Sequence, residues 1–159
     1  MADQIGPVLV KQTSLTGQDA TAQEKLGTRM QVNNKGYVYV QCRSAIAVGQ
    51  VLGTLSSASG QSSYKVTGII ANCSVKKPAG VALATASAGS YVWLQYKGYT
   101  THVKTDGSIG ATSILAWLTN KVAKCATAAH ISGRHFGYSR AADSGSVAVS
   151  AHLECLDGL

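Results

Sequence analysis

The stretch Tyr-Val-Tyr-Val-Gln-Cys at residues 37–42 alternates small apolar side chains with larger aromatic or polar ones. Successive side chains of a β-strand point to opposite faces, so this period of two predicts a strand with Val38, Val40 and Cys42 on one face. The cluster Asn33-Asn34-Lys35-Gly36 comes directly before it and is rich in turn-forming residues. We therefore expect a β-domain to begin at about Gly36.

Short runs of β-branched and aromatic residues continue from there to the end of the chain, with turn signals about every 8–12 residues. No long segment shows the 3.6-residue period of an amphipathic helix, although a short helical turn is expected within 45–52. The pattern predicts an all-β fold, a compact antiparallel β-sandwich or β-barrel. The further expected strands are 63–70, 80–83, 87–89, 91–96, 99–104, 114–118, 121–127, 136–140 and 146–154, with a hairpin turn at Asp106-Gly107.

Residues 1–35 differ in composition from the rest of the chain. The segment QTSLTGQDATAQ at 12–23 is polar, lacks aromatic residues and shows no sustained period. We expect an extended or loosely ordered arm that contributes few core side chains. Stretched at ~3.3 Å per residue, such an arm would reach on the order of 100 Å. The expected organisation is an extended N-terminal arm at 1–35 and a single β-domain at 36–159.

Charged residues are scarce and mostly basic. They make up 13% of the chain, against roughly 25% in an average soluble protein. The 14 Lys and Arg outnumber the 7 Asp and Glu, for a net charge of +7. A basic body suits a nucleic acid, an anionic membrane or an acidic protein. The longest basic run is only Lys76-Lys77, so nucleic acid is not the expected partner.

No stretch approaches the ~20 apolar residues of a membrane span, and the first residues lack the pattern of a signal peptide. We therefore expect no membrane partner and synthesis in a cytoplasm.

Cysteine and histidine offer no clear metal site. No two cysteines have the C-x-x-C spacing of a zinc or redox motif. Cys42 and Cys155 each follow alternating apolar residues, which predicts buried free thiols. The histidines are interpreted as solvated surface residues, because they fall on polar strand faces or beside a loop. The cysteines are Cys42, Cys73, Cys125 and Cys155, and the histidines are His102, His130, His135 and His152.

Acid–base chemistry has few candidate groups. Between residues 25 and 142 the only acid is Asp106, in the expected hairpin turn. The chain contains no G-x-S-x-G elbow, phosphate loop or G-x-G-x-x-G fingerprint. We expect a protein that is not an enzyme and uses no cofactor or metal. Two interpretations of the aromatic residues remain: a stacking platform for bases or sugars, or cross-strand packing on a sheet. The residues concerned are Tyr37, Tyr39, Tyr91 and Trp93.

Several phrases between Gly36 and Leu115, about half the chain, resemble those of tailed-phage head proteins. The resemblance implies a capsid decoration (cement) or minor head protein, which is small, β-rich (β-tulip-like), often trimeric and bound to the capsid exterior. The phrases are GYVYV at 36–40, SAIAVGQVL at 44–52, KPAGVALA at 77–84, GSYVWLQYKG at 89–98, Val103 with Asp106-Gly107, and GATSIL at 110–115.

On this resemblance, the expected function is to bind the outer surface of a phage capsid and stabilise it. The expected partners are the major capsid protein and further copies of the chain in a homotrimer. An arm that adds a strand to a capsid subunit, repeated in a symmetric oligomer, would supply the grip. The alternatives are another virion β-module (head fibre base, tail tube or connector component) and a carbohydrate- or nucleic-acid-binding β-domain. The candidate capsid-contact residues are Gln12, Thr13, Leu15, Lys25, Arg29, Lys76 and Lys77.

Overall fold

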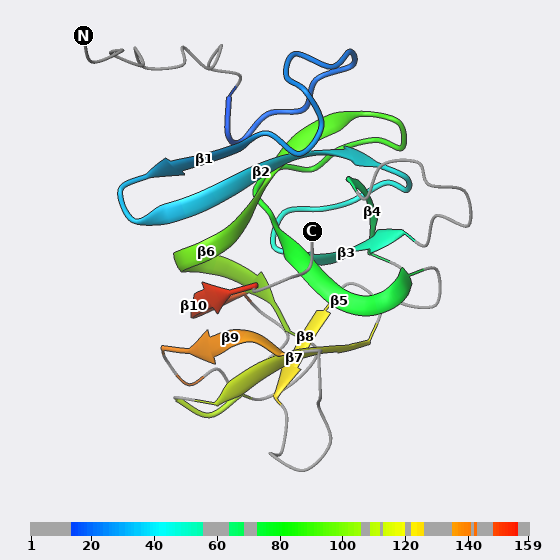
Figure 1. The fold of residues 1–159 in the computed structure, drawn as a ribbon. Coiled ribbons are helices and arrows are strands. Elements are labelled where there is room, and N and C mark those ends of the chain that lie inside the picture. The colour runs from blue at the N-terminus through cyan, green and yellow to red at the C-terminus, as the bar shows by residue number, and fades with distance from the viewer. Residues whose placement is uncertain are drawn as a thin grey trace, which may run out of the picture.

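A computed structural model describes residues 14–55, 64–68, 73–105, 109–111, 113–119, 122–125, 135–140, 142 and 148–155. Every helix or strand in these ranges is a β-strand, which confirms the all-β prediction (Figure 1). None of the described residues forms a helix long and apolar enough to cross a membrane. The strands are β1 (Arg29–Val32), β2 (Lys35–Cys42), β3 (Val51–Leu55), β4 (Lys65–Thr67), β5 (Cys73–Ala82), β6 (Tyr91–Lys104), β7 (Ile114–Thr119), β8 (Val122–Cys125), β9 (His135–Ser139) and β10 (Ala148–Glu154).

The strands form one sheet in the order β1-β2-β4-β3-β5-β6-β10-β9-β7-β8, and β2 also pairs with β6. The second pairing closes β2, β4, β3, β5 and β6 into a ring, while β10, β9, β7 and β8 extend from β6 toward the other end of the molecule (Figure 1). The sheet is not wholly antiparallel as predicted, because β2 and β4 run parallel. A parallel pair needs a crossover connection, and the chain between these strands passes through β3.

Strand β6 belongs to both parts of the sheet. Its first half pairs with β2 and its second half with β10. The change of partner occurs at Gly98, which has a φ of +89°. A Cβ at this position would lie 2.6 Å from the backbone oxygen of Asn34, so only glycine lets β6 pass the β1–β2 turn so closely. The sequence predicts two strands here, 91–96 and 99–104, where the structure has one bent strand.

Two apolar cores pack against the sheet, and Tyr96 of β6 contacts both of them. The core of the ring is built from small side chains such as Val38, Val40 and Leu94, and it includes Cys42. The other core is larger in its side chains, with Trp117, Phe136 and Leu153 fully buried and Cys155 beside them. The expected face of Val38, Val40 and Cys42 is therefore confirmed as a core face.

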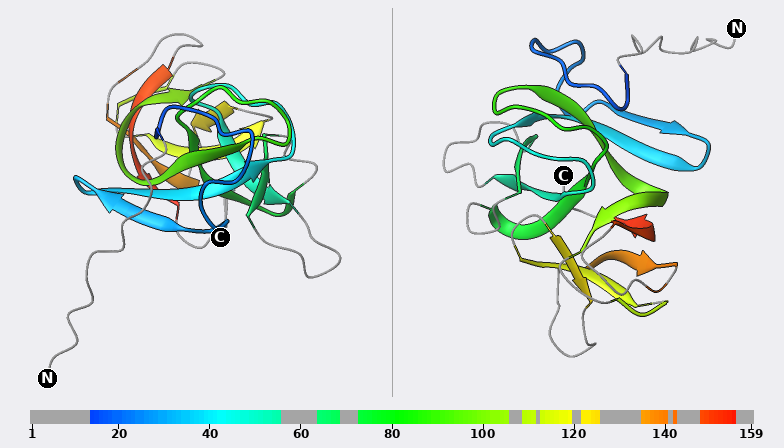
Figure 2. Two further views of the ribbon diagram at one scale, coloured as in Figure 1. Left: turned by 90° about the horizontal axis from the view of Figure 1, so that it is seen from above. Right: turned by 180° about the vertical axis from the view of Figure 1, so that it is seen from behind.

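The segment before β2 differs from the expected arm. Residues 33 and 34 form the two-residue turn of a β1–β2 hairpin, with φ of 48° at Asn33 and 63° at Asn34. Residues 14–28, here called the strap, then cross the outer face of β2 and β6 (Figure 2). The predicted boundary between residues 35 and 36 therefore falls inside β2, and the polar composition of 14–28 concealed two apolar anchors, Leu15 and Leu26.

Two loops of the ring share one backbone conformation. Residues 43–50 join β2 to β3, and residues 83–90 join β5 to β6. Each passes through two bends and one bridging residue before a turn, and each turn contains a glycine of positive φ, 81° at Gly49 and 87° at Gly89. We call them the twin loops. The expected helical turn in 45–52 and the expected strand at 87–89 are both wrong, since these residues form the matching turns.

The twin loops also hold each other through matching hydrogen bonds. Ile46 and Ala86 exchange two backbone bonds, of 2.9 and 3.1 Å. The Gly89 N–H donates to the carbonyl oxygen of Cys42, the last residue of β2, at 2.7 Å. The Gly49 N–H donates to the carbonyl oxygen of Ala82, the last residue of β5, at 2.8 Å. These reciprocal bonds relate the two loops by a local approximate two-fold arrangement.

Candidate functional site

The strap covers an aromatic cluster on the outer face of β2 and β6. Tyr37, Tyr39 and Trp93 are almost completely buried there. Leu15, Leu26 and Met30 pack over them, together with Leu83 and Tyr91 of the second twin loop and β6. The rings of Tyr39 and Trp93 lie 5.1 Å apart at an interplanar angle of 55°. Because these rings are covered, the cluster does not form the open stacking platform that a base or sugar requires, and cross-strand packing is the correct interpretation.

Polar contacts fasten the strap at its centre. The Tyr39 hydroxyl donates to a carboxylate oxygen of Asp19 at 2.7 Å and accepts from the N–H of Gln23 at 3.2 Å. Asp19 and Tyr91 exchange two backbone bonds, both of 2.9 Å. The Gln18 amide oxygen accepts from the Ser87 N–H at 2.9 Å. Residues far apart in the sequence therefore join the strap to β2, to β6 and to the second twin loop.

Burial controls the pKa of Tyr39. Loss of water around the phenol raises its pKa to about 12, and the negative charge of Asp19 acts in the same direction. Burial also raises the pKa of Tyr37. Both side chains are therefore neutral phenols near neutral pH, and Tyr39 keeps the proton that it donates to Asp19.

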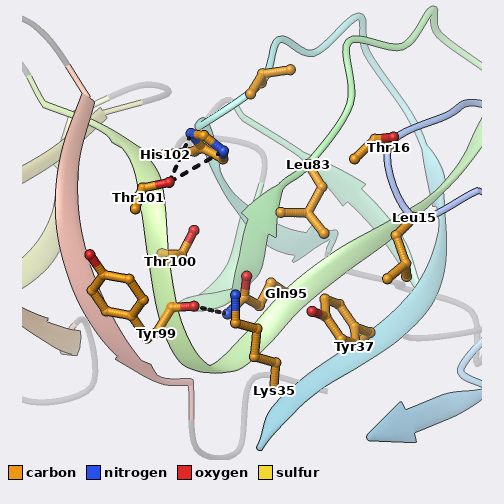
Figure 3. A pocket seen from close by; sticks show the side chains of 11 residues that line it. Leu15, Thr16, Lys35, Tyr37, Leu83, Gln95, Tyr99, Thr100, Thr101 and His102 are labelled. Atoms are coloured by element: carbon orange, nitrogen blue, oxygen red, sulfur yellow. Dashed lines mark hydrogen bonds between the residues drawn. The ribbon is translucent and has the colours of Figure 1, made fainter. Parts of the chain in front are cut away.

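An open groove borders the strap and has a volume of about 260 Å³ (Figure 3). Its floor is β6, where Gln95 and Thr100 are buried. Tyr99 and Val48, 44% and 36% exposed, are apolar residues of its rim. The remaining lining residues are Leu15, Thr16, Lys35, Tyr37, Leu83, Thr101 and His102.

The polar groups of the groove are partly occupied by its own walls. The Gln95 amide donates to the carbonyl oxygens of Lys97 and Tyr99, at 3.2 and 3.0 Å. The Tyr99 hydroxyl donates to Ser150 Oγ at 3.2 Å, which holds its ring beside β10. Lys35 and His102 lie at opposite ends of the groove (Figure 3). This arrangement can hold a small apolar or hydroxyl-bearing group by contact. Among the described lining residues, no carboxylate is present to pair with His102 for acid–base catalysis.

Of the predicted capsid-contact residues, Leu15, Lys25 and Arg29 have described side chains. Leu15 lies half-buried against the aromatic cluster and at the groove. Lys25 is exposed on the strap, and the exposed Arg29 places its guanidinium 5.4 Å from the centre of the Tyr96 ring. Lys76 and Lys77 belong to β5, but their side chains lie outside the described part of the structure, as do Gln12 and Thr13. Capsid contact by these residues stays a prediction.

The described cysteines agree with the sequence analysis. Cys42 and Cys155 are buried free thiols, and burial raises the pKa of each to about 12. The side chains of Cys73 and Cys125 lie outside the described residues.

Among the histidines, His102 is exposed and His152 stacks on Tyr138 with ring centres 5.3 Å apart. The side chains of His130 and His135 are not described. In the described ranges, no three His, Cys, Asp or Glu residues come together as a metal site would require.

The likeness of this chain to known proteins lies in its fold. No protein-family model matches the chain, and no curated protein matches it. Among solved structures, the fold is similar to the N base of head fiber gp8.5 in bacteriophage phi29, with a TM-score of 0.54. The match covers 74% of this chain and 92% of that chain at 11% sequence identity. At this identity the likeness concerns the fold alone.

Proposed function

We propose that this chain is a non-enzymatic structural protein of a phage virion and acts as a β-module on the head, in the manner of a fibre base. The observation that carries the proposal is the fold likeness, which takes in 92% of a head fiber base domain. The independent resemblance of the phrases in 36–115 to tailed-phage head proteins points to the same class.

Capsid decoration is the second candidate, and the strap makes it less favoured than a fibre base. Decoration was expected to depend on an arm that orders only on the capsid. Residues 14–28 are instead packed on the chain's own sheet, with Asp19 and Leu26 among their contacts. The major capsid protein and a homotrimer of this chain remain the proposed partners.

Virion membership is tested by immunogold labelling of purified particles of the phage that encodes the chain. We expect gold on the exterior of the head, with mass spectrometry finding the chain in gradient-purified particles. Gold over regular lattice positions would favour decoration, and gold at the foot of head projections would favour a fibre base. Particles that contain none of the chain, or label confined to the tail, would contradict the proposal.

A further inference from the structure

The twin loops have the same backbone but different surroundings at their tips. The tip of the first loop is covered by β6: the Lys104 N–H donates to the Gly49 carbonyl oxygen at 2.8 Å. A Cβ on Gly49 would collide with the His102 carbonyl oxygen. The first loop therefore serves as a seat for an extended strand, which it holds by a backbone hydrogen bond.

The tip of the second loop is open at Ala88 and Gly89, while at its edge the strap's Gln18 accepts from the Ser87 N–H at 2.9 Å. Apart from Gly89 and its two chain neighbours, no heavy atom of the described residues lies within 4 Å of the position that a Cβ on Gly89 would take. Ser87, Ala88 and Gly89 are all exposed. The Gly89 carbonyl oxygen accepts from the Gln41 amide at 3.1 Å, and a carbonyl oxygen has a second lone pair for another donor. The second loop thus has the same backbone conformation as the first, but no described strand lies on its tip as β6 lies on the tip of the first loop.

The recess beside this uncovered tip is polar and positively charged. It has a volume of about 300 Å³ and lies between the second loop, the end of β2 and β4. Two cations line it, the exposed Arg43 and the half-buried Lys65. No acid is among its described lining residues, which are Gln41, Cys42, Arg43, Lys65, Ala88 and Gly89. An occupant that brings carboxylates would meet complementary charge there.

We infer that the second twin loop, with Arg43 and Lys65, docks an extended acidic segment of another virion protein, as the first twin loop holds β6. A backbone N–H of that segment donates to the Gly89 carbonyl oxygen in the way that Lys104 donates to Gly49. Its carboxylates pair with the two cations. This inference rests on the proposed virion function and names the surface through which the chain attaches.

The twin loops supply a matched pair of positions for cross-linking. Ala88 and Val48 occupy equivalent places beside the two turn glycines, and both are exposed. A photo-reactive benzoylphenylalanine is placed at either position in the full-length chain, which is supplied during infection and recovered in particles. We expect Ala88 to cross-link to a different virion protein, within an acid-rich peptide that mass spectrometry identifies. We expect Val48, at the groove, to give at least tenfold less of this product.

Charge reversal provides the second arm of the experiment. Arg43→Glu combined with Lys65→Glu should lower incorporation into particles at least tenfold. The control combines Lys97→Glu with Arg140→Glu, two exposed cations outside the recess, and should change incorporation less than twofold. Both double variants are compared only after their melting temperatures are shown to match the parent chain.

The outcomes separate the two claims. Absence of the parent chain from particles overturns the proposed virion function. If the parent chain is incorporated, three results overturn the docking inference alone: no Ala88 product, an Ala88 product with another copy of this chain or a segment without acids, or equal incorporation of both double variants.

Discussion

At the scale of single residues, Tyr39 joins the strap to the sheet. Tyr39→Phe removes a bond to a carboxylate and one to a backbone N–H, so we expect the free energy of unfolding to fall by about 1–3 kcal/mol. Tyr91→Phe is the control: its hydroxyl accepts one bond from the Gln41 side chain, and its loss should stay within about 0.5 kcal/mol. Urea denaturation measures the free energy of unfolding of both variants. Equal losses in the two would contradict the role of Tyr39 in joining the strap to the sheet.

The same residue predicts a response to alkaline pH. The pKa of Tyr39 rises from 10.0 to about 12 on folding, so the folded state holds this proton more tightly than the unfolded state. Its stabilisation is complete below pH 10 and is lost as the pH rises toward 12. Tyr39→Phe should therefore show a shallower loss of stability over this interval, measured by urea denaturation at each pH.

Gly49 and Gly89 test the difference between the twin loops. Both have positive φ, so alanine at either position carries strain of about 1–2 kcal/mol. At Gly49 the added methyl group also meets the His102 carbonyl, whereas at Gly89 it meets open space. We expect Gly49→Ala to lower the melting temperature by several degrees more than Gly89→Ala. An equal effect would show that β6 does not seat on the first loop.

Cys42 and Cys155 are expected to resist alkylation while the chain is folded. With pKa values of about 12, only about one molecule in ten thousand carries either thiolate at pH 8. Brief iodoacetamide treatment followed by peptide mapping should find both unmodified in the native chain and modified in guanidinium. Rapid native labelling of either would show that its core opens.

At the scale of elements, the sequence predicts a strand well where one face of the strand is buried, because apolar and polar side chains then alternate. It fails where this two-residue alternation is absent. Val38 and Val40 reveal β2 through simple alternation. β1 and β3 were missed, because β1 is mostly exposed and β3 is short and buried on both faces. The sequence of the strap predicts a loose arm, because Leu15 and Leu26 are isolated within a polar stretch and the residues that they contact lie much later in the chain.

The strap and β1 are expected to be part of the stable fold. Removing residues 1–32 uncovers Tyr37, Tyr39 and Trp93 and removes three half-buried apolar side chains. At ~1 kcal/mol or more for each of these side chains, plus the lost hydrogen bonds, we expect a loss of at least about 3 kcal/mol. Tryptophan emission should shift to the red. Val32→Thr, at a side chain already 41% exposed, is the control and should change little; an unchanged melting temperature for the deletion would contradict the packing.

At the scale of the whole molecule, the sequence indicated an all-β chain but not its topology. The closing β2–β6 pair and the parallel β2–β4 pair depend on contacts between distant strands, which local alternation does not encode. The candidate surfaces were hidden for the same reason: the groove and the recess each combine residues from separate strands and loops. Arg43 and Lys65 gave no local signal, since neither belongs to a basic run.

The central claim is that the chain is a head component of a virion. Its most direct test is cryo-electron microscopy of wild-type particles and of particles from a phage lacking the gene. We predict difference density on the outside of the head that fits the ten-stranded sheet, with the second twin loop facing the shell or a neighbouring head protein. Identical heads in the two maps, or difference density only in the tail, would contradict the account.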